Sequence, residues 1–373
     1  MSYLLYFCAK RGNMDNKEVI DSIIEVPKIK IEKEKLLTKI DILKKLSAGT
    51  GLREALNDIV KGGMGGLIVI DNSRSYNVFK GGFYVNCKFT SKRLTELAKM
   101  DGAIILSDDF KKILYANTLL VPSMEYSSSE TGTRHQAAER TARQINGLVI
   151  AVSERRGVIT TYYGNSRYVL QDTQELLIRA TEALQILDKQ RDVLNELIIN
   201  LNVLEVTSLV SVSDVCNVLE RLEMIRKMGA IINEYILELG KDGVIARMRL
   251  RELTKGIDEK EELIINDYIS KPLRTIQFLD GLSFEGLLDV ENLAKTIFGK
   301  SLDSSVTPKG IRILEKTHLS RQEIDLLIKH FKNLDEILNA DAETLEKVLK
   351  DSGENLQREL NTIREHIIVG KKI

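Results

Sequence analysis

The stretch SSSETGTRHQAAERTARQINGLVIAVS, residues 127–153, combines a turn, a helix and a strand. Residues 134–144 (RHQAAERTARQ) have the composition of a helix, and the apolar run 147–153 has the length of a buried strand. A Gly-Thr turn stands directly before the helix. A helix that leads straight into an apolar strand is typical of an α/β domain, in which helices cover a sheet.

Strand-like and helix-like runs alternate on both sides of this stretch. Helical spacing occurs in residues 34–46, 52–60 and 91–100. The pattern predicts an α/β domain over residues 30–171, with a central mixed sheet covered by helices. The strand-like runs are rich in Val, Ile, Leu and Tyr, and they are LIVID (67–71), FYVNCKF (83–89), GAIILS (102–107), KILYAN (112–117), LLVP (119–122), GLVIAVS (147–153), VITTYY (158–163) and SRYVL (166–170).

Residues 172–299 lose the strand signals, and we interpret them as a helical linker domain. The sequence SVSD (211–214) predicts a capping box for a helix from Asp214 to Leu239, which Gly240 ends. A long packed helix is expected before it, because leucines recur there at steps of three, four and seven residues. These leucines are Leu177, Leu184, Leu187, Leu194, Leu197, Leu201 and Leu204.

Residues 300–373 alternate short helical runs with brief turns, which is typical of small helix-hairpin-helix modules. In such modules the backbone N–H groups of a glycine-bearing turn receive a DNA phosphate. Here Gly353 fits the turn, but Asp351 stands where its first glycine is expected. The region also carries 13 Lys or Arg and 13 Asp or Glu, so it gains little from counterion release.

Composition excludes several broad classes of protein. The 54 basic and 54 acidic residues balance, so no overall field attracts nucleic acid or membrane. The chain has no Trp and only 5% aromatic residues, which argues against base-stacking platforms. The three cysteines, Cys8, Cys87 and Cys216, lie far apart and indicate a reducing cytosol rather than a disulfide framework.

The first residues, MSYLLYFCAKRGNM (1–14), predict neither a signal peptide nor a membrane span. Their positive charges follow the apolar run instead of preceding it, and the run is too short to cross a bilayer. We expect residues 1–29 to be a poorly ordered extension, with Met14 as an alternative start. The predicted location is therefore cytoplasmic, without membrane contact.

Two common catalytic motifs are absent from the sequence. There is no G-x-x-x-x-G-K-[ST] phosphate loop and no H-E-x-x-H zinc motif. The glycine-rich segment KGGMGG (61–66) leads into a strand, so we interpret it as a tight turn.

Two stretches could carry chemistry. Asp101, at the start of the strand-like run KMDGAIILS (99–107), is either a turn residue or a carboxylate for a hard divalent cation. Arg134 and His135 stand at a predicted helix start, where they are either solvated or paired with acids. Because cations at this end oppose the helix dipole, their placement is easier to explain if an anion normally lies between them.

Together these stretches resemble the diadenylate cyclase family. The sequence MDGAIILS (100–107) is followed about thirty residues later by ETGTRH (130–135), and the next strand ends in AVSERRG (151–157). The order of the three regions is similar to the DNA-integrity-scanning branch of this family, with a cyclase domain, a helical middle and a helix-hairpin-helix domain. Other specific pieces of the resemblance are YAN (115–117), LVP (120–122), AERTA (138–142) and ARMRLREL (246–253).

The resemblance implies an enzyme that condenses two ATP molecules into cyclic di-AMP and two pyrophosphates. It implies a bound Mg²⁺ or Mn²⁺, two cyclase domains face to face, and assembly as a homo-octamer. It also implies modulation of the activity by DNA, including branched structures, at residues 300–373.

The resemblance further implies a role for each matching residue. Asp101 binds the metal and activates the 3′-hydroxyl, with His135 near the same metal. Gly102 lets the nucleotide approach the backbone, and Leu120 lies against adenine. Phosphate contacts come from Thr133, Arg134, His135 and Ser153, with added positive charge from Arg155 or Arg156.

One position departs from the family pattern. The motif Arg-His-Arg is Arg-His-Gln here, and Gln136 has neither the charge nor the bidentate fork of arginine. We therefore keep a second interpretation, a DNA-structure-binding scaffold with a weakened or inactive cyclase site. A third is a sensor that binds or hydrolyses ATP.

Overall fold

The computed structural model describes residues 38–72, 75–349 and 353–369. The predicted extension 1–29, the alternative start at Met14, the first residues of the helix 34–46 and the hairpin position Asp351 lie outside these ranges. By residue contacts the chain divides into residues 1–39 and 40–373. All the strands described below belong to the second unit.

An eight-stranded mixed sheet forms the first part of this unit. Along the sheet the order is β2-β5-β4-β1-β6-β7-β8, with β3 paired to β5. Among the described strands, β1 and β4 run parallel, and the other neighbouring pairs are antiparallel. The strands are β1 (Gly66–Ile70), β2 (Phe79–Lys80), β3 (Phe83–Lys88), β4 (Ala103–Leu106), β5 (Lys112–Leu120), β6 (Leu148–Ser153), β7 (Val158–Tyr163) and β8 (Ser166–Leu170).

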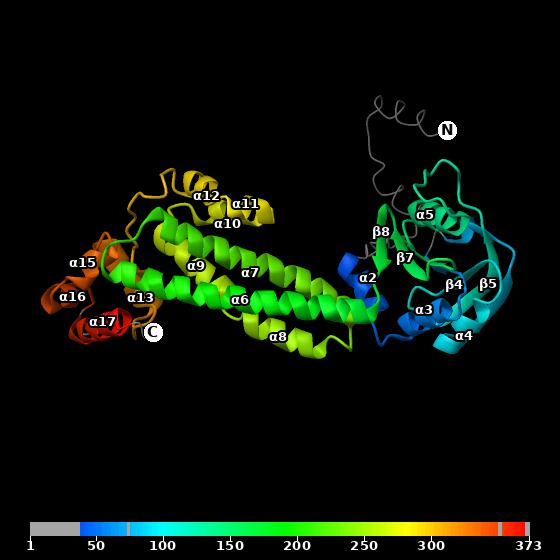
Figure 1. The fold of residues 1–373 in the computed structure, drawn as a ribbon, viewed down its shortest axis with the longest axis horizontal. Coiled ribbons are helices and arrows are strands. Elements are labelled where there is room, and N and C mark those ends of the chain that lie inside the picture. Colours follow the sequence, from blue (N-terminus) through cyan, green and yellow to red (C-terminus); the bar gives the residue numbers. More distant parts are fainter. Residues whose placement is uncertain (1–37, 73–74, 350–352, 370–373) are drawn as a thin grey trace, which may run out of the picture. The chain divides into compact units, whose positions relative to one another are not determined.

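Helices cover both faces of the sheet (Figure 1). Every residue of β1 and β4 is buried, as expected for strands packed on two sides. Side chains alternate between the faces, so Val69 packs with Ala142 of one helix while its neighbours face the other layer. The helices are α2 (Lys39–Leu46), α3 (Gly51–Lys61), α4 (Ser91–Leu97) and α5 (Thr133–Ile145).

The structure corrects the prediction of two separate strands at 112–117 and 119–122. The first run and residues 119–120 of the second belong to the single strand β5, and Val121 and Pro122 lie beyond it. Asn117 has a left-handed φ of 54°, and the register with β4 shifts nearby. Asparagine tolerates this conformation, so the strand carries an irregularity there instead of ending.

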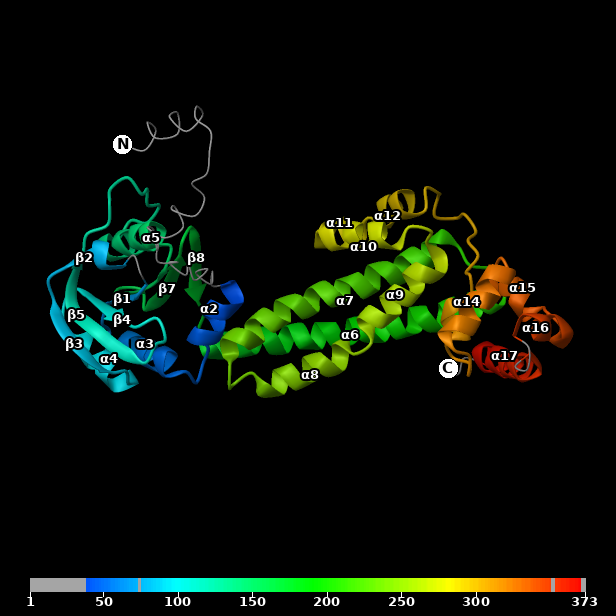
Figure 2. The same ribbon diagram turned by 180° about the vertical axis from the view of Figure 1, so that it is seen from behind.

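Long helices follow the sheet. α6 (Thr173–Val206) packs along α7 (Val212–Leu239), and the two lie side by side in Figures 1 and 2. The predicted capping box is confirmed, because Ser211 and Asp214 cap each other's backbone. The further helices are α8 (Val244–Thr254), α9 (Ile257–Tyr268), α10 (Pro272–Gly281), α11 (Phe284–Leu288) and α12 (Val290–Ile297).

The leucine stripe of α6 is confirmed over most of its length but not at its start. Leu184, Leu187, Leu194 and Leu201 are buried, whereas Leu177 is 44% exposed. At the start of α6, Leu239 from the end of α7 packs with Leu176 and not with Leu177.

In the described part of the chain, five helices after residue 310 share an apolar cluster with Val206 at the end of α6. Gly353 begins the last helix, and a side chain there would meet the backbone of Glu346 at 2.5 Å. This close approach lets the last two helices pack as a hairpin. The helices are α13 (Ile311–Leu314), α14 (Arg321–His330), α15 (Leu334–Leu338), α16 (Ala342–Leu349) and α17 (Gly353–Ile368).

The predicted fold class is thus confirmed, with a helix-covered mixed sheet followed by helical regions. Within the described ranges, no helix combines the length and apolar character needed to cross a membrane. Cys87 and Cys216 are free thiols.

Candidate functional site

Four strand ends meet at one edge of the sheet. The parallel register of β1 with β4 puts Asp101 at the level of Gly65. The antiparallel registers of β6 and β5 with these strands put Ser153 and Leu120 at that level as well. Because neighbouring strands are about 4.8 Å apart, these four backbone positions span about 15 Å. We call them the site edge.

Helix α5 brings Thr133, Arg134 and His135 to the same edge. It ends at Asn146, whose left-handed φ of 48° turns the chain into β6. The helix packs on β6 and runs back along it, so its N-terminus lies near the end of β6 at Ser153.

No side chain of the described residues caps the first turn of α5. Gly132 occupies the N-cap position and supplies no acceptor. The N–H groups of this turn can therefore donate to an anion, and the helix dipole favours negative charge there.

Arg134 lies directly over the backbone of Gly65. A Cβ atom at Gly65 would come within 1.9 Å of the Arg134 guanidinium Nη1. The segment KGGMGG (61–66) does form the predicted turn, since Gly62 caps α3 and Gly63 has a φ of 62°. Its last part also has a second function, because the missing side chain of Gly65 makes room for the arginine.

Gly102 is required by the fold itself. It has a φ of 91°, and a side chain there would meet the backbone oxygen of Thr118 at 2.8 Å. The close approach of β5 thus explains this glycine, and it leaves the backbone beside Asp101 uncovered by a side chain. The predicted contact of Gly102 with nucleotide stays a prediction.

Glu130 fixes the loop that precedes α5. Its carboxylate accepts hydrogen bonds from Tyr162 Oη (2.8 Å) and Arg167 Nε (2.6 Å). Its carbonyl oxygen accepts one from Gln136 Nε2 (2.8 Å). Gln136, the position that departs from the family pattern, therefore holds the loop in place.

This cluster also sets the protonation of its members. Partial burial alone would raise the pKa of Glu130, but the hydrogen bonds from Arg167 and Tyr162 outweigh it and hold that pKa below its usual value. Burial, followed by the nearby Glu130 carboxylate, raises the pKa of Tyr162. At neutral pH the glutamate is ionised and the tyrosine is a hydrogen-bond donor.

His135 has a buried nitrogen available for a ligand. Its Nδ1 has no hydrogen-bond partner among the described residues. Burial lowers the pKa of His135, and the charge of Glu130 only partly opposes this. The positive charges of Arg167, Arg134 and Arg156 lower the pKa further. A neutral imidazole can accept a proton or bind a metal.

Ser153 and the two arginines after it form the turn that leaves β6. Ser153 Oγ accepts a hydrogen bond from the Arg156 backbone N–H (3.3 Å). Arg155 and Arg156 are exposed, and the charge of Arg156 acts on His135. Leu120 is half-buried against the core.

The protein side chains alone do not form a metal cage. In the part of the chain that the structure describes, no three His, Cys, Asp or Glu side chains are arranged to hold a metal ion. Asp101 is exposed at the site edge. Magnesium is commonly bound by one or two carboxylates together with substrate phosphates, and one exposed aspartate fits that mode.

Sequence reasoning missed Gly65, Glu130, Tyr162 and Arg167. Glu130 stood in the quoted turn, but no local spacing pairs it with Tyr162 or Arg167. Tyr162 and Arg167 face each other through the β7–β8 register, which no local pattern reveals.

Two family models match the chain. Residues 53–167 match the DisA bacterial checkpoint controller nucleotide-binding domain. Residues 170–305 match the DisA bacterial checkpoint controller linker region.

Curated relatives match over most of their length. The DNA integrity scanning protein DisA of Clostridioides difficile is 41% identical over 82% of this chain and 88% of the relative. That of Acetivibrio thermocellus is 42% identical over 83% and 89%. That of Clostridium kluyveri is 40% identical over 92% and 100%. Among solved structures, a double mutant of DacA from Staphylococcus aureus covers 35% of this chain and 88% of its own, with 21% identity and a TM-score of 0.28.

Proposed function

Because the chain belongs to the family of DNA integrity scanning proteins and carries their nucleotide-binding domain, we propose that it is a diadenylate cyclase. It condenses two ATP molecules into cyclic di-AMP and two pyrophosphates. The observation that carries the proposal is the site edge, where Arg134, the unpartnered His135 Nδ1 and the uncapped start of α5 lie near Asp101.

The proposed reaction needs positioning and charge neutralisation. The 3′-oxygen of each ATP attacks the α-phosphorus of the other, the bond to the β-phosphate oxygen breaks, and pyrophosphate leaves while the hydroxyl proton passes to solvent. The N–H groups at the start of α5 and the guanidinium of Arg134 hold phosphate oxygens. Ser153 and Arg155 or Arg156 lie beside them for further phosphate contacts, and Leu120 contacts adenine.

A divalent cation, Mg²⁺ or Mn²⁺, belongs to this proposal. When bound, it neutralises phosphate charge and increases the acidity of the attacking hydroxyl. Asp101 would hold it, and the neutral His135 lies near the same place. Both metals accept carboxylate and phosphate oxygen ligands, so either is suitable.

A second copy of the chain must face the first, because one site holds one ATP. Exposed apolar side chains flank the site edge, and Leu119 is 67% exposed. Val121 and Met124, which follow in the chain, are also exposed. We propose that the facing copy covers them within a homo-octamer. Light scattering of Leu119→Glu should then show a smaller assembly together with lost product formation.

DNA is the proposed regulator at residues 300–373. The packing of α16 and α17 at Gly353 supports a helical hairpin there. Gel shifts at low salt with branched and linear DNA test this, and cyclase assays with the same DNA test modulation. If neither DNA is retarded, regulation by DNA is excluded.

The central test compares two aspartates that flank β4. The protein is incubated with ATP and Mg²⁺ or Mn²⁺, and the products are resolved by chromatography. Asp101→Asn should reduce cyclic di-AMP formation about 100-fold or more. Asp108→Asn, at the opposite end of the strand, should keep the parent rate. If the parent forms no product with either metal while it binds DNA, the scaffold interpretation replaces the cyclase.

Gln136 gives a second test of the same function. Its side chain is already bound to the Glu130 carbonyl, and an arginine there could keep one such bond while adding a charge. Gln136→Arg should therefore raise the rate of product formation. An unchanged or lower rate would contradict this role of residue 136.

A further inference from the structure

We infer that Glu238, in the last turn of α7 and outside the cyclase domain, is a positioning residue for the nucleotide site. The inference rests on the proposed function and extends it to the control of that site. Glu238 is buried at the place where α7 meets the sheet domain, and it connects to Arg134 and to the loop of Glu130 by two separate routes.

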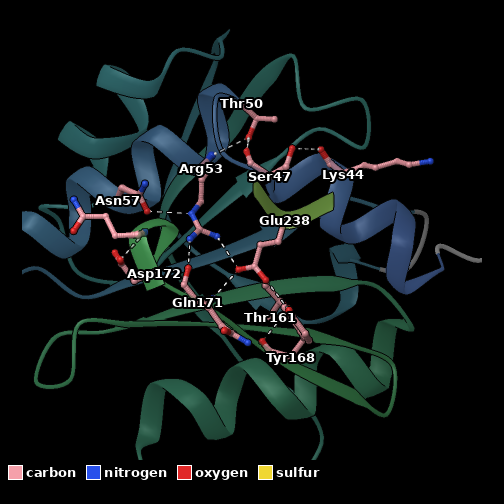
Figure 3. A network of polar contacts seen from close by, with 11 residues as sticks. Lys44, Ser47, Thr50, Arg53, Asn57, Thr161, Tyr168, Gln171, Asp172 and Glu238 are labelled. Carbon is pink, nitrogen blue, oxygen red and sulfur yellow. Dashed lines mark hydrogen bonds and ion pairs between the residues drawn. The ribbon is translucent and has the colours of Figure 1, made fainter. Parts of the chain in front are cut away.

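The contact is a polar cluster, which we call the cyclase joint, formed by the buried Arg53 and Glu238 and the half-buried Tyr168 and Gln171 (Figure 3). Glu238 Oε1 lies 3.4 Å from Arg53 Nη1 and accepts the Gln171 backbone N–H at 2.7 Å. Glu238 Oε2 accepts the Tyr168 hydroxyl at 2.6 Å. The arginine and glutamate side chains are 4% and 1% exposed. One carboxylate therefore fixes α3 and the end of β8 to α7.

The first route to the site runs through β8. Tyr168 and Gln171 both lie in the joint. Arg167, which directly precedes Tyr168 in β8, donates to Glu130 at 2.6 Å. Glu130 in turn holds the loop before α5 through Tyr162 and Gln136. A shift of β8 at the joint is thus passed to the residue that orients the phosphate-binding turn.

The second route runs through α3. Arg53 lies in the first turn of this helix, and its Nη2 donates to the Gln171 carbonyl at 2.5 Å. The other end of α3 leads through Gly62 into Gly65, over which the Arg134 guanidinium lies. A helix moves largely as a rigid element, so displacement of Arg53 alters the surface on which Arg134 rests.

The chain offers a matched control at the other end of the helical middle. There Glu205 of α6 accepts hydrogen bonds from Tyr268 Oη (2.5 Å) and Arg312 Nη2 (2.5 Å). Arg312 also binds Asn202, and Asp267 accepts its backbone N–H. We call these five residues the C-terminal joint. It has the same Glu-Arg-Tyr chemistry but contains no residue of the sheet domain.

The test compares Glu238→Gln with Glu205→Gln in the full chain. Both remove a buried charge and leave an arginine behind, so both should lower the thermal midpoint. Glu238→Gln should lower kcat for cyclic di-AMP formation about 10-fold, with a smaller change in KM, because displaced catalytic groups act mainly in the transition state. Glu205→Gln should keep kcat within about 2-fold in the absence of DNA.

A second pair of variants makes smaller changes, so that a loss of activity is not caused by misfolding. Tyr168→Phe and Tyr268→Phe each remove one hydroxyl, and only Tyr168→Phe should lower kcat, about 3-fold. Gly65→Ala displaces Arg134 directly and serves as a reference. Like Glu238→Gln, it should change kcat more than KM. Equal kcat in the parent and both joint variants, or equal losses at the two joints, overturns the inference.

Failure of the proposed function is distinguishable from failure of the inference. A fluorescent ATP analogue labelled on the base reports nucleotide binding without turnover. If the parent binds it but makes no product, the cyclase assignment fails, and the inference still requires about 3-fold weaker binding in Glu238→Gln than in Glu205→Gln. In that case equal affinities of the two variants overturn the inference, and so does a parent that does not bind the analogue.

Discussion

The cyclase joint and the C-terminal joint use the same side chains with a different charge balance. At the cyclase joint, one carboxylate, Glu238, meets one guanidinium, Arg53. At the C-terminal joint, Arg312 meets Glu205, and a second carboxylate, Asp267, lies beside them. Within the joints as defined, the first pairs one carboxylate with one guanidinium and the second has one carboxylate more, and Glu234, outside the first joint, also acts on Tyr168.

That extra carboxylate has a structural use. Asp267 accepts backbone N–H groups at the start of α13, from Gly310 at 2.6 Å and Ile311 at 3.1 Å. Burial, then the charge of Glu205, raises the pKa of Asp267 to about 6, although Arg312 and the backbone donors oppose this. The comparison teaches that an identical Glu-Arg-Tyr unit becomes pH-sensitive when a helix-capping aspartate joins it.

The largest expected effect comes from removing each arginine. Arg53→Met and Arg312→Met leave buried carboxylates without their cation, which typically costs about 3–5 kcal/mol of folding free energy. The loss should be larger for Arg312→Met, because two acids remain at that joint and one at the other. Urea unfolding at pH 8 measures both losses. Arg249→Met, at an exposed ion pair, should change little. Equal losses of stability at the two joints would contradict the effect of the second carboxylate.

The next effect is the pH dependence of stability at the C-terminal joint. Asp267 has a pKa of about 6 in the fold and an ordinary value of 3.8, so the unfolded chain releases this proton first as pH rises. Stability is therefore lost between about pH 4 and 6, and the loss above that range is about 3 kcal/mol. Asp267→Asn lacks this titration, so the stability of the parent relative to the variant should fall by that amount between pH 4 and 7.

Parent and variant unfolding curves at each pH test this directly, because titrating groups away from the joint cancel in the difference. A flat difference for Asp267→Asn would contradict the assigned role of the second carboxylate.

Sequence patterns were sufficient wherever the cause was local. The capping box at Ser211 and Asp214 follows from four adjacent residues, and it is present. The mixed sheet followed from apolar runs bounded by turn residues, and the family followed from two motifs about thirty residues apart. The proposed roles of the site residues, including Asp101 and Ser153, stay predictions that the assays above address.

Sequence patterns failed where the partner was distant or the backbone unusual. Asn117 was interpreted as a strand boundary, but its left-handed backbone lies inside β5. Glu238 looks like any surface acid in its helix, and its partner Arg53 is 185 residues away. Gly65 gave a turn signal, while its contact with Arg134 depends on how α5 packs on the sheet. Such contacts are fixed by tertiary packing, which no local period encodes.

The smallest effect tests whether charge alone separates the two joints. Tyr168→Phe and Tyr268→Phe each remove a neutral donor from a buried carboxylate, at a cost of about 1–2 kcal/mol. Neither changes the charge balance, so the two losses should be similar, unlike those of the arginine variants. Hydrogen exchange gives a local measurement, because the Gln171 amide donates to Glu238 and the Gly310 amide to Asp267. Each variant should speed exchange at its own joint only. A clearly larger loss for Tyr268→Phe would mean that packing, and not charge, makes the C-terminal joint the more sensitive one.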